Sequence, residues 1–210
     1  MNWIYFYTKR NYLLVKSFFD KKNLVNSSDT YFYKWNRIHK LRNLYEIPIL
    51  IETGTYYGLT VSKFRNYFDK IFSIEIDEPL YEKNKSFFSK IKNIEILFGD
   101  SKAVLPNILD RYNDKDNLAK IIFWLDGHCS EGETGIGDEY SPLLNELAVI
   151  LNYLTYIKPI IIIDDVRLFD GVQYPTLESV RNFFLGYDFT LNIDNDGLII
   201  IDNRLFHKSS

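Results

Sequence analysis

Residues 50–58 read Leu-Ile-Glu-Thr-Gly-Thr-Tyr-Tyr-Gly, and this stretch is the clearest structural signal in the chain. An apolar run that begins at Ile47 ends in an acid, and two glycines four positions apart follow. Val61 and Phe64 then recur at helical spacing. The pattern predicts a buried parallel strand, a tight glycine turn and the start of a helix. Such a turn lets a ligand approach the bare backbone.

Strands and helices alternate from Pro48 onward. The expected strands are 49–53, 71–76, 94–98, 121–126, 159–164, 187–192 and 197–202, and the expected helices are 58–68, 78–90, 101–110, 140–155 and 175–184. This alternation predicts a doubly wound α/β fold with helices on both faces of a mostly parallel, seven-stranded sheet. The short connection 193–197 contains an Asp-Gly step, which is typical of a hairpin, so the sheet should end in an antiparallel strand.

Residues 1–45 are expected to form an N-terminal helical extension, and residues 46–210 the main domain. Aromatic residues lie among Lys and Arg at loosely helical spacing, and residues 26–29 indicate a break or helix cap. Two interpretations remain open. The helices could pack across the core domain or form a contact between two copies of the chain. Alternatively, they could form a lid over a site or a surface that touches a membrane-bound partner.

Composition narrows the class of protein. The net charge of −3 gives no general sign of a nucleic-acid partner, although the basic-aromatic N-terminal segment leaves that partner open. The single cysteine, Cys129, cannot form an internal disulfide, which fits a reducing compartment. No apolar run approaches the roughly 20 residues that span a bilayer, and no signal peptide is visible. We therefore expect a cytoplasmic protein without a transmembrane segment.

Acidic residues follow the first three expected strands. Glu52 precedes the glycine turn, Glu75 ends the second strand and Asp100 follows the third. Ligands of open parallel sheets bind at this edge. Glu75 suits a ribose, because a carboxylate can accept from both hydroxyls. Glu52 suits a cationic group and would repel a pyrophosphate. The acids therefore favour a positively charged adenosine without phosphate, although Asp77 and Asp100 are also placed to cap helices.

These motifs resemble those of class I S-adenosylmethionine-dependent methyltransferases. Residues 52–58 are similar to the acid-x-Gly-x-x-x-Gly motif, 73–77 to the second motif, and 99–101 to the adenine-side motif. The resemblance covers about residues 46–203 and implies a Rossmann-like methyltransferase fold with S-adenosylmethionine as cofactor. The cofactor-binding residues that it implies are Glu52, Gly54, Thr55, Gly58, Glu75, Ile76, Asp100, Ser101 and Asp126.

A second acidic cluster is expected on the acceptor side. In the class I strand order, the strands that end at Asp126 and at Asp164-Asp165 are neighbours, about 4.8 Å apart. Three carboxylates this close repel one another unless a cation joins them or one is protonated. Oxygen ligands of this kind suit a divalent ion such as Mg²⁺, so Asp126, Asp164 and Asp165 are the candidate metal ligands.

Residues 125–128 together with 163–165 resemble metal-assisted O-methyltransferases that act on the sugars of macrolides and aminocoumarins. In those enzymes the corresponding aspartates bind the ion and help to deprotonate a sugar hydroxyl. This chain carries His128 where a second acid often stands. His128 is the first candidate for the general base, because its unperturbed pKa lies near neutrality, and Asp126 is the second.

The sequence therefore predicts an S-adenosylmethionine-dependent O-methyltransferase that acts on a sugar or glycan hydroxyl with help from a divalent metal. The expected partner is a small-molecule or glycan acceptor, not a nucleic acid, and a homodimer is an open expectation. One alternative is a non-catalytic nucleoside-binding partner subunit. Another is an NAD-dependent Rossmann oxidoreductase, which the absent three-glycine fingerprint disfavours.

Overall fold

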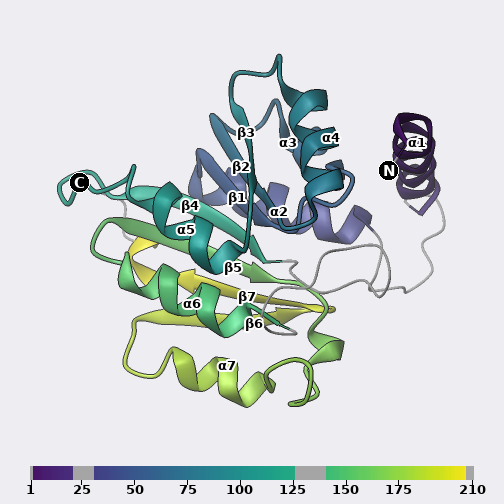
Figure 1. The fold of residues 1–210 in the computed structure, drawn as a ribbon. Coiled ribbons are helices and arrows are strands. Elements are labelled where there is room, and N and C mark those ends of the chain that lie inside the picture. Colours follow the sequence, from purple (N-terminus) through teal and green to yellow (C-terminus); the bar gives the residue numbers. More distant parts are fainter. Residues whose placement is uncertain (1, 21–30, 126–140, 207–210) are drawn as a thin grey trace.

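The structure of the chain is a computed structural model, and it describes residues 2–20, 31–125 and 141–206 (Figure 1). In these ranges, strands and helices form one mixed sheet with helices on both faces. The strands are β1 (Ile49–Thr53), β2 (Lys70–Glu75), β3 (Ile94–Phe98), β4 (Ala119–Leu125), β5 (Ile157–Ile163), β6 (Phe189–Asp194) and β7 (Gly197–Asp202). The helices are α1 (Trp3–Asp20), α2 (Tyr31–Tyr45), α3 (Leu59–Phe64), α4 (Glu78–Phe88), α5 (Ser101–Leu109), α6 (Leu143–Asn152) and α7 (Leu177–Phe183), with short 3₁₀ turns η1 (Val166–Leu168) and η2 (Asn203–Leu205).

The strands lie in the order β3-β2-β1-β4-β5-β7-β6. Strands β1 to β5 are parallel, and β7 runs antiparallel to both β5 and β6. The register pairs Thr53 with Leu125, so the tips of β1 and β4 are level. The strand order reverses between these two strands. Such a reversal opens the crevice where doubly wound sheets bind their ligands.

Side chains of the central strands alternate between two hydrophobic clusters. In β4, Ile121, Phe123 and Leu125 pack in the cluster that includes α5, α6 and α7, while Ile122 and Trp124 pack in the cluster that includes α2 and α3. All five are almost completely buried. A strand that is covered on both faces reads as a continuous apolar run, which explains the sequence pattern.

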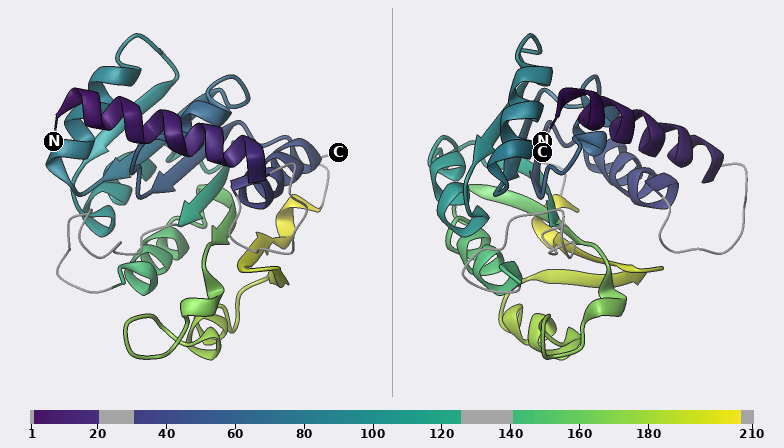
Figure 2. Two further views of the ribbon diagram at one scale, coloured as in Figure 1. Left: turned by 90° about the vertical axis from the view of Figure 1, so that its right-hand side faces the viewer. Right: turned by 45° about the vertical axis from the view of Figure 1, so that its right-hand side comes forward.

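The two N-terminal helices attach in different ways. Ile38 and Leu41 of α2 belong to the core cluster on one face of the sheet. Helix α1 lies outside that layer, and Figure 2 shows it running across the molecule beside α4. The buried ring of Phe6 contacts Tyr57 with ring centroids 5.4 Å apart, and the Arg10 guanidinium lies 4.2 Å from the centre of the Phe87 ring. Helix α1 therefore covers the turn that follows β1.

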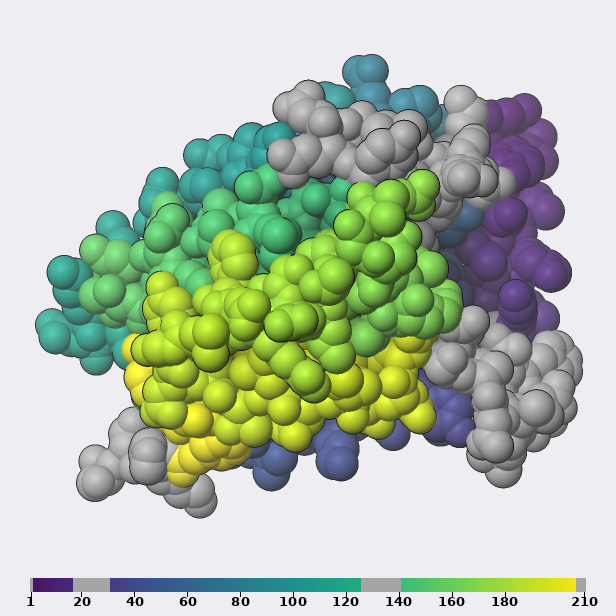
Figure 3. Space-filling view, turned by 90° about the horizontal axis from the view of Figure 1, so that it is seen from below, coloured from purple at the N-terminus to yellow at the C-terminus, as the bar shows by residue number. Residues whose placement is uncertain are grey.

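The C-terminal hairpin, formed by β6 and β7, lies at the edge of the sheet farthest from β3. Figure 3 shows α7, β6 and β7, in yellow-green and yellow, in the middle of the face seen from below. β6 pairs with β7 from Phe189↔Asp202 to Asp194↔Gly197. The connection is therefore a two-residue turn at 195–196, in which Asn195 has a φ of 52°.

The predicted fold class is confirmed: the sheet has seven strands and an antiparallel end. Several predicted ends of elements were wrong. The strand expected at 187–192 is Phe189–Asp194, because the tight turn carries the pairing two residues further. The helix expected at 58–68 ends at Phe64, and that expected at 140–155 is Leu143–Asn152. Apolar periodicity marks the buried face of a helix more reliably than its ends.

Within the described ranges, no helix has both the length and the apolar character needed to cross a bilayer.

The turn after β1 needs glycine for two separate reasons. Gly58 is the N-cap residue directly before α3 and has a φ of 66°, a left-handed conformation that residues with a Cβ disfavour. A Cβ atom at this position would also lie 2.5 Å from Asn84 Oδ1 and 2.7 Å from Phe88 Cε2, and both of these residues belong to α4. The second glycine of the motif thus lets α3 and α4 pack closely beneath the turn.

Replacing Gly58 by alanine should therefore lower the free energy of unfolding by more than the backbone strain alone would. Gly186→Ala is a matched control, because Gly186 has a φ of 88° and a Cβ added there would meet no described atom within 4 Å. We expect Gly58→Ala to lower the free energy of unfolding by about 2–4 kcal/mol, and Gly186→Ala by about 1–2 kcal/mol. Urea unfolding followed by circular dichroism measures both. Equal losses would show that the contact with α4 does not matter.

Candidate active site

The first acid of the motif, Glu52, lies at the end of β1 and is only 2% exposed. Ser73 of β2 donates its hydroxyl to Glu52 Oε2 at 2.6 Å, and the hydroxyls of Ser73 and Thr55 are 2.7 Å apart. The backbone N–H groups of Gly54 and Thr55 both donate to the carbonyl of Ile74, at 3.0 and 3.1 Å. These bonds fasten the turn to the tip of β2. Glu52, Gly54 and Thr55 thus lie together at the end of β1, next to the tip of β2.

Glu75, at the tip of β2, accepts two backbone hydrogen bonds. The Tyr56 N–H donates to Oε2 at 2.7 Å, and the Asp77 N–H donates to Oε1 at 2.9 Å. Burial raises the pKa of the Glu75 carboxyl, and these backbone donors partly oppose the rise. Each carboxylate oxygen can accept two hydrogen bonds, so Glu75 keeps acceptor capacity for a ligand. The Asp77 side chain instead caps α4, where it accepts from the Leu80 N–H at 2.8 Å.

Asp100 caps α5, as one interpretation of the sequence allows. Its Oδ1 accepts from the Lys102 N–H at 3.0 Å, and Lys102 Nζ lies 3.6 Å from its other oxygen. The Gly99 N–H donates to the carbonyl of Glu75 at 2.9 Å, so the loop with Asp100 and Ser101 lies beside Glu75. Capping uses one oxygen of Asp100 and does not exclude a ligand at the other.

The acceptor side of the predicted site is described only in part. Asp126 and His128, the two candidate bases, lie outside the described residues, and so does the loop that carries them. Asp164 and Asp165 follow β5 and are 6% and 4% exposed. Asp165 has a φ of 56°, a left-handed conformation that is uncommon for a residue other than glycine.

Two side-chain cations lie against this aspartate pair. Lys34 of α2 forms an ion pair with Asp164 and lies 3.4 Å from Asp165 Oδ1. Arg167 Nη1 lies 2.8 Å from Asp165 Oδ1 and also pairs with Asp196 in the hairpin turn. A cation at this cluster is expected from the sequence, but Lys34 is not identified there. No local signal could have found it, since 131 positions separate Lys34 from Asp165.

This arrangement is a poor fit for the predicted magnesium ion. Asp164 and Asp165 offer oxygen ligands, but the ammonium of Lys34 lies against both and would repel a divalent cation. Among the described residues, no group of three His, Cys, Asp or Glu side chains could hold a metal. The third predicted ligand, Asp126, is outside those ranges. With Lys34 in this position, the described residues do not form a metal site.

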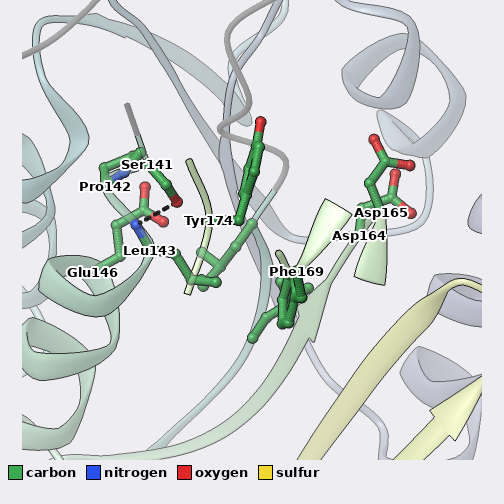
Figure 4. A pocket seen from close by; sticks show the side chains of 10 residues that line it. Ser141, Pro142, Leu143, Glu146, Asp164, Asp165, Phe169 and Tyr174 are labelled. Carbon is green, nitrogen blue, oxygen red and sulfur yellow. Dashed lines mark hydrogen bonds between the residues drawn. The ribbon is translucent and has the colours of Figure 1, made fainter. Parts of the chain in front are cut away.

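A pocket lies between the tips of β4 and β5, the start of α6, and the segment that contains Phe169 and Tyr174 (Figure 4). Asp164 and Asp165 line one part of it. Glu146 of α6 lines another part, and sequence reasoning missed this residue as a site candidate. A signal existed: Leu143, Glu146, Leu147 and Ile150 form the buried face of α6, and Glu146 is the one acid among them.

The Glu146 carboxyl is 1% exposed, and burial raises its pKa from 4.5 to about 7. Hydroxyl groups of Ser101 and Thr53 lower that pKa, while the negative charge of Asp100 raises it further. These neighbours place Glu146 beneath the tip of β1 and the start of α5. Its Oε1 has no hydrogen-bond partner among the described residues.

Glu146 should make the stability of the protein depend on pH. Because its pKa is higher in the folded chain, the stabilisation from the protonated form is present below about pH 4.5 and is lost as the pH rises through about 7. Between pH 5 and pH 8, the wild-type protein should therefore lose on the order of 3 kcal/mol relative to Glu146→Gln. Urea unfolding at both pH values tests this, with the exposed Glu178→Gln as control. Parallel pH profiles for wild type and Glu146→Gln would contradict it.

No protein-family model matches the chain, and no curated protein matches it. Solved structures do. TomG from Streptomyces achromogenes, an O-methyltransferase involved in tomaymycin synthesis and solved in complex with SAM, aligns with a TM-score of 0.57 at 18% identity, covering 90% of this chain and 87% of that one. An O-methyltransferase from Bacillus cereus in complex with SAH aligns with a TM-score of 0.55 at 15% identity, and the alignment covers 92% of this chain and 89% of that one.

SAH-bound PaMTH1, a methyltransferase from Podospora anserina, gives a TM-score of 0.55 at 13% identity and covers 90% of this chain and 86% of that chain. At these identities the likeness concerns the fold. The strand order, the antiparallel end and these alignments together show that the chain has the Rossmann-like fold of S-adenosylmethionine-dependent methyltransferases.

Proposed function

We propose that this protein is an S-adenosylmethionine-dependent O-methyltransferase that acts on a sugar or glycan hydroxyl. The observation that carries the cofactor class is the pair of buried acids at the tips of β1 and β2, in a methyltransferase fold. Glu52 and Glu75 are 2% and 3% exposed and lie on either side of the turn. A carboxyl at Glu52 favours a cationic ligand and opposes a pyrophosphate. The oxidoreductase alternative is disfavoured for the same reason.

The cofactor-binding residues are then divided among the ribose, the adenine and the methionine part of the cofactor. Glu75, which the Tyr56 and Asp77 amides hold in place, accepts from the ribose hydroxyls. Asp100 and Ser101 border the adenine with Ile76 beside them, and Glu52, Gly54, Thr55 and Gly58 surround the methionine part. When bound, S-adenosylmethionine supplies an electrophilic methyl group. The protein contributes mainly by positioning the acceptor and excluding water.

The acceptor hydroxyl must lose its proton during transfer, because an alcohol is a poor nucleophile at neutral pH. His128 is the proposed general base, and Asp126 is the second candidate. A sugar as acceptor is supported by the resemblance of residues 125–128 and 163–165 to sugar O-methyltransferases. The partner-subunit alternative predicts that the chain binds the nucleoside but methylates no acceptor.

Calorimetric titration with S-adenosylhomocysteine tests the cofactor class. We expect saturable binding by the wild-type protein and no binding of NAD. Glu75→Gln should weaken the binding of S-adenosylhomocysteine about tenfold or more, because it replaces a buried, charged hydrogen-bond acceptor by a neutral amide. Glu82→Gln, on the exposed face of α4, is the matched control. Binding of NAD without binding of S-adenosylhomocysteine would reverse the proposal.

Magnesium at Asp126, Asp164 and Asp165 is the part of the proposal that Lys34 opposes. If the lysine already supplies the positive charge, ~10 mM MgCl₂ should leave the melting temperature of the wild-type protein unchanged. In Lys34→Met the same salt should raise it by a few degrees, because a vacated cluster can bind the ion. Lys40→Met, an exposed lysine of the same helix, is the control. Equal stabilisation of wild type by Mg²⁺ would show that the metal displaces Lys34.

A further inference from the structure

The described part of the pocket contains a buried carboxyl oxygen that the assignments above do not use. Glu146 Oε1 is buried and accepts no hydrogen bond from any described residue. Leaving such an atom unpaired is costly, and more so when the group is charged. A leucine at this position would continue the apolar face of α6 without that cost. An unpaired buried acceptor in a pocket wall therefore points to a donor that arrives with a ligand.

The position of Glu146 indicates which ligand brings the donor. The pocket is bounded by the tips of β4 and β5, the start of α6 and the segment with Phe169 and Tyr174, and its described lining includes no residue of β1, β2 or β3. The nucleoside is assigned to the tips of those other three strands. The second substrate is therefore the ligand that enters this pocket. In Figure 4, Glu146 and the aspartate pair lie on opposite sides of Tyr174.

The composition of the pocket suits a molecule with hydroxyl groups. Phe169 and Tyr174 supply aromatic surface, and Glu146, Asp164 and Asp165 supply carboxyl groups. Sugars present apolar C–H faces and several O–H donors, and both match this wall. A cationic ligand is less suited, because the positive charges of Lys34 and Arg167 already lie against the aspartates and would repel it.

We propose that Glu146 is an acceptor-binding residue, whose Oε1 accepts a hydrogen bond from a hydroxyl group of the sugar that is methylated. This inference rests on the proposed function and deepens it by naming a residue of the sugar subsite. The hydroxyls of Ser101 and Thr53 lie beside the same carboxyl on the cofactor side and lower its pKa. Glu146 thus lies at the boundary between the two substrates.

The test uses the full chain, tritiated S-adenosylmethionine and a panel of methyl glycosides of glucose, galactose, mannose, rhamnose and xylose. For the best glycoside, Glu146→Leu, which removes the acceptor atom, should raise KM about tenfold or more while kcat changes less than about threefold, because a hydrogen bond made equally in the ground and transition states affects KM alone. Glu146→Gln keeps an amide oxygen that can accept, so it should raise KM less than Glu146→Leu does. The affinity for S-adenosylhomocysteine should stay within about twofold in both variants, and Glu178→Gln should match wild type.

The possible outcomes separate this inference from the proposed function. If wild type binds S-adenosylhomocysteine and methylates a glycoside, but Glu146→Leu keeps the wild-type KM, only this inference is overturned. A loss of S-adenosylhomocysteine affinity as large as the loss for the glycoside would also overturn it, by assigning Glu146 to the nucleoside. If wild type binds S-adenosylhomocysteine but methylates no glycoside, both the sugar acceptor and this inference fail. Absence of S-adenosylhomocysteine binding would overturn the proposed function itself.

Discussion

The candidate site depends on how buried carboxylates are kept satisfied where the parallel strands end. A carboxylate that is taken out of water must find hydrogen bonds or opposite charge nearby. Glu52 accepts a hydrogen bond from the hydroxyl of Ser73, and Glu75 accepts hydrogen bonds from two backbone N–H groups. The aspartate pair after β5 receives two side-chain cations. These solutions differ chemically: a neutral donor satisfies a carboxylate oxygen without supplying an opposite charge, whereas an ion pair supplies one. The aspartate pair on the acceptor side is of the second kind.

Helix α2 gains importance from this division of charge. It contributes Ile38 to the hydrophobic core and Lys34 to the aspartate pair, so the N-terminal segment helps to build the acceptor side. Arg37 of the same helix donates to the backbone carbonyl of Asp194 at 2.5 Å, and Arg167 pairs with Asp196 in the same hairpin. The hairpin of β6 and β7, helix α2 and the segment after β5 thus share a network of charges. A change in any of them would alter the charge of the acceptor pocket.

How much of this structure the sequence could predict depends on how far apart the interacting residues lie in the chain. The turn at Gly54 and Gly58 and the acids at strand tips were predictable because motif, strand and helix are adjacent in the chain. Lys34 was not, because its pairing with Asp164 depends on how α2 packs against the sheet. Glu146 lies between these cases. An acid among the leucines of an amphipathic helix is visible in sequence, but only the structure shows that no described residue donates a hydrogen bond to its Oε1.

Glu146 also shows why stability alone does not explain this pocket. Its carboxyl is held where burial raises the pKa to about 7, so ionising it near neutral pH works against folding. A leucine would extend the cluster formed by Leu143, Leu147 and Ile150 and remove this penalty. Proteins tolerate such positions chiefly at functional sites, where a group that destabilises the empty pocket gains its partner on binding. The same substitution is then expected to stabilise the folded chain and to weaken acceptor binding, two opposite effects that a purely structural role for Glu146 could not produce.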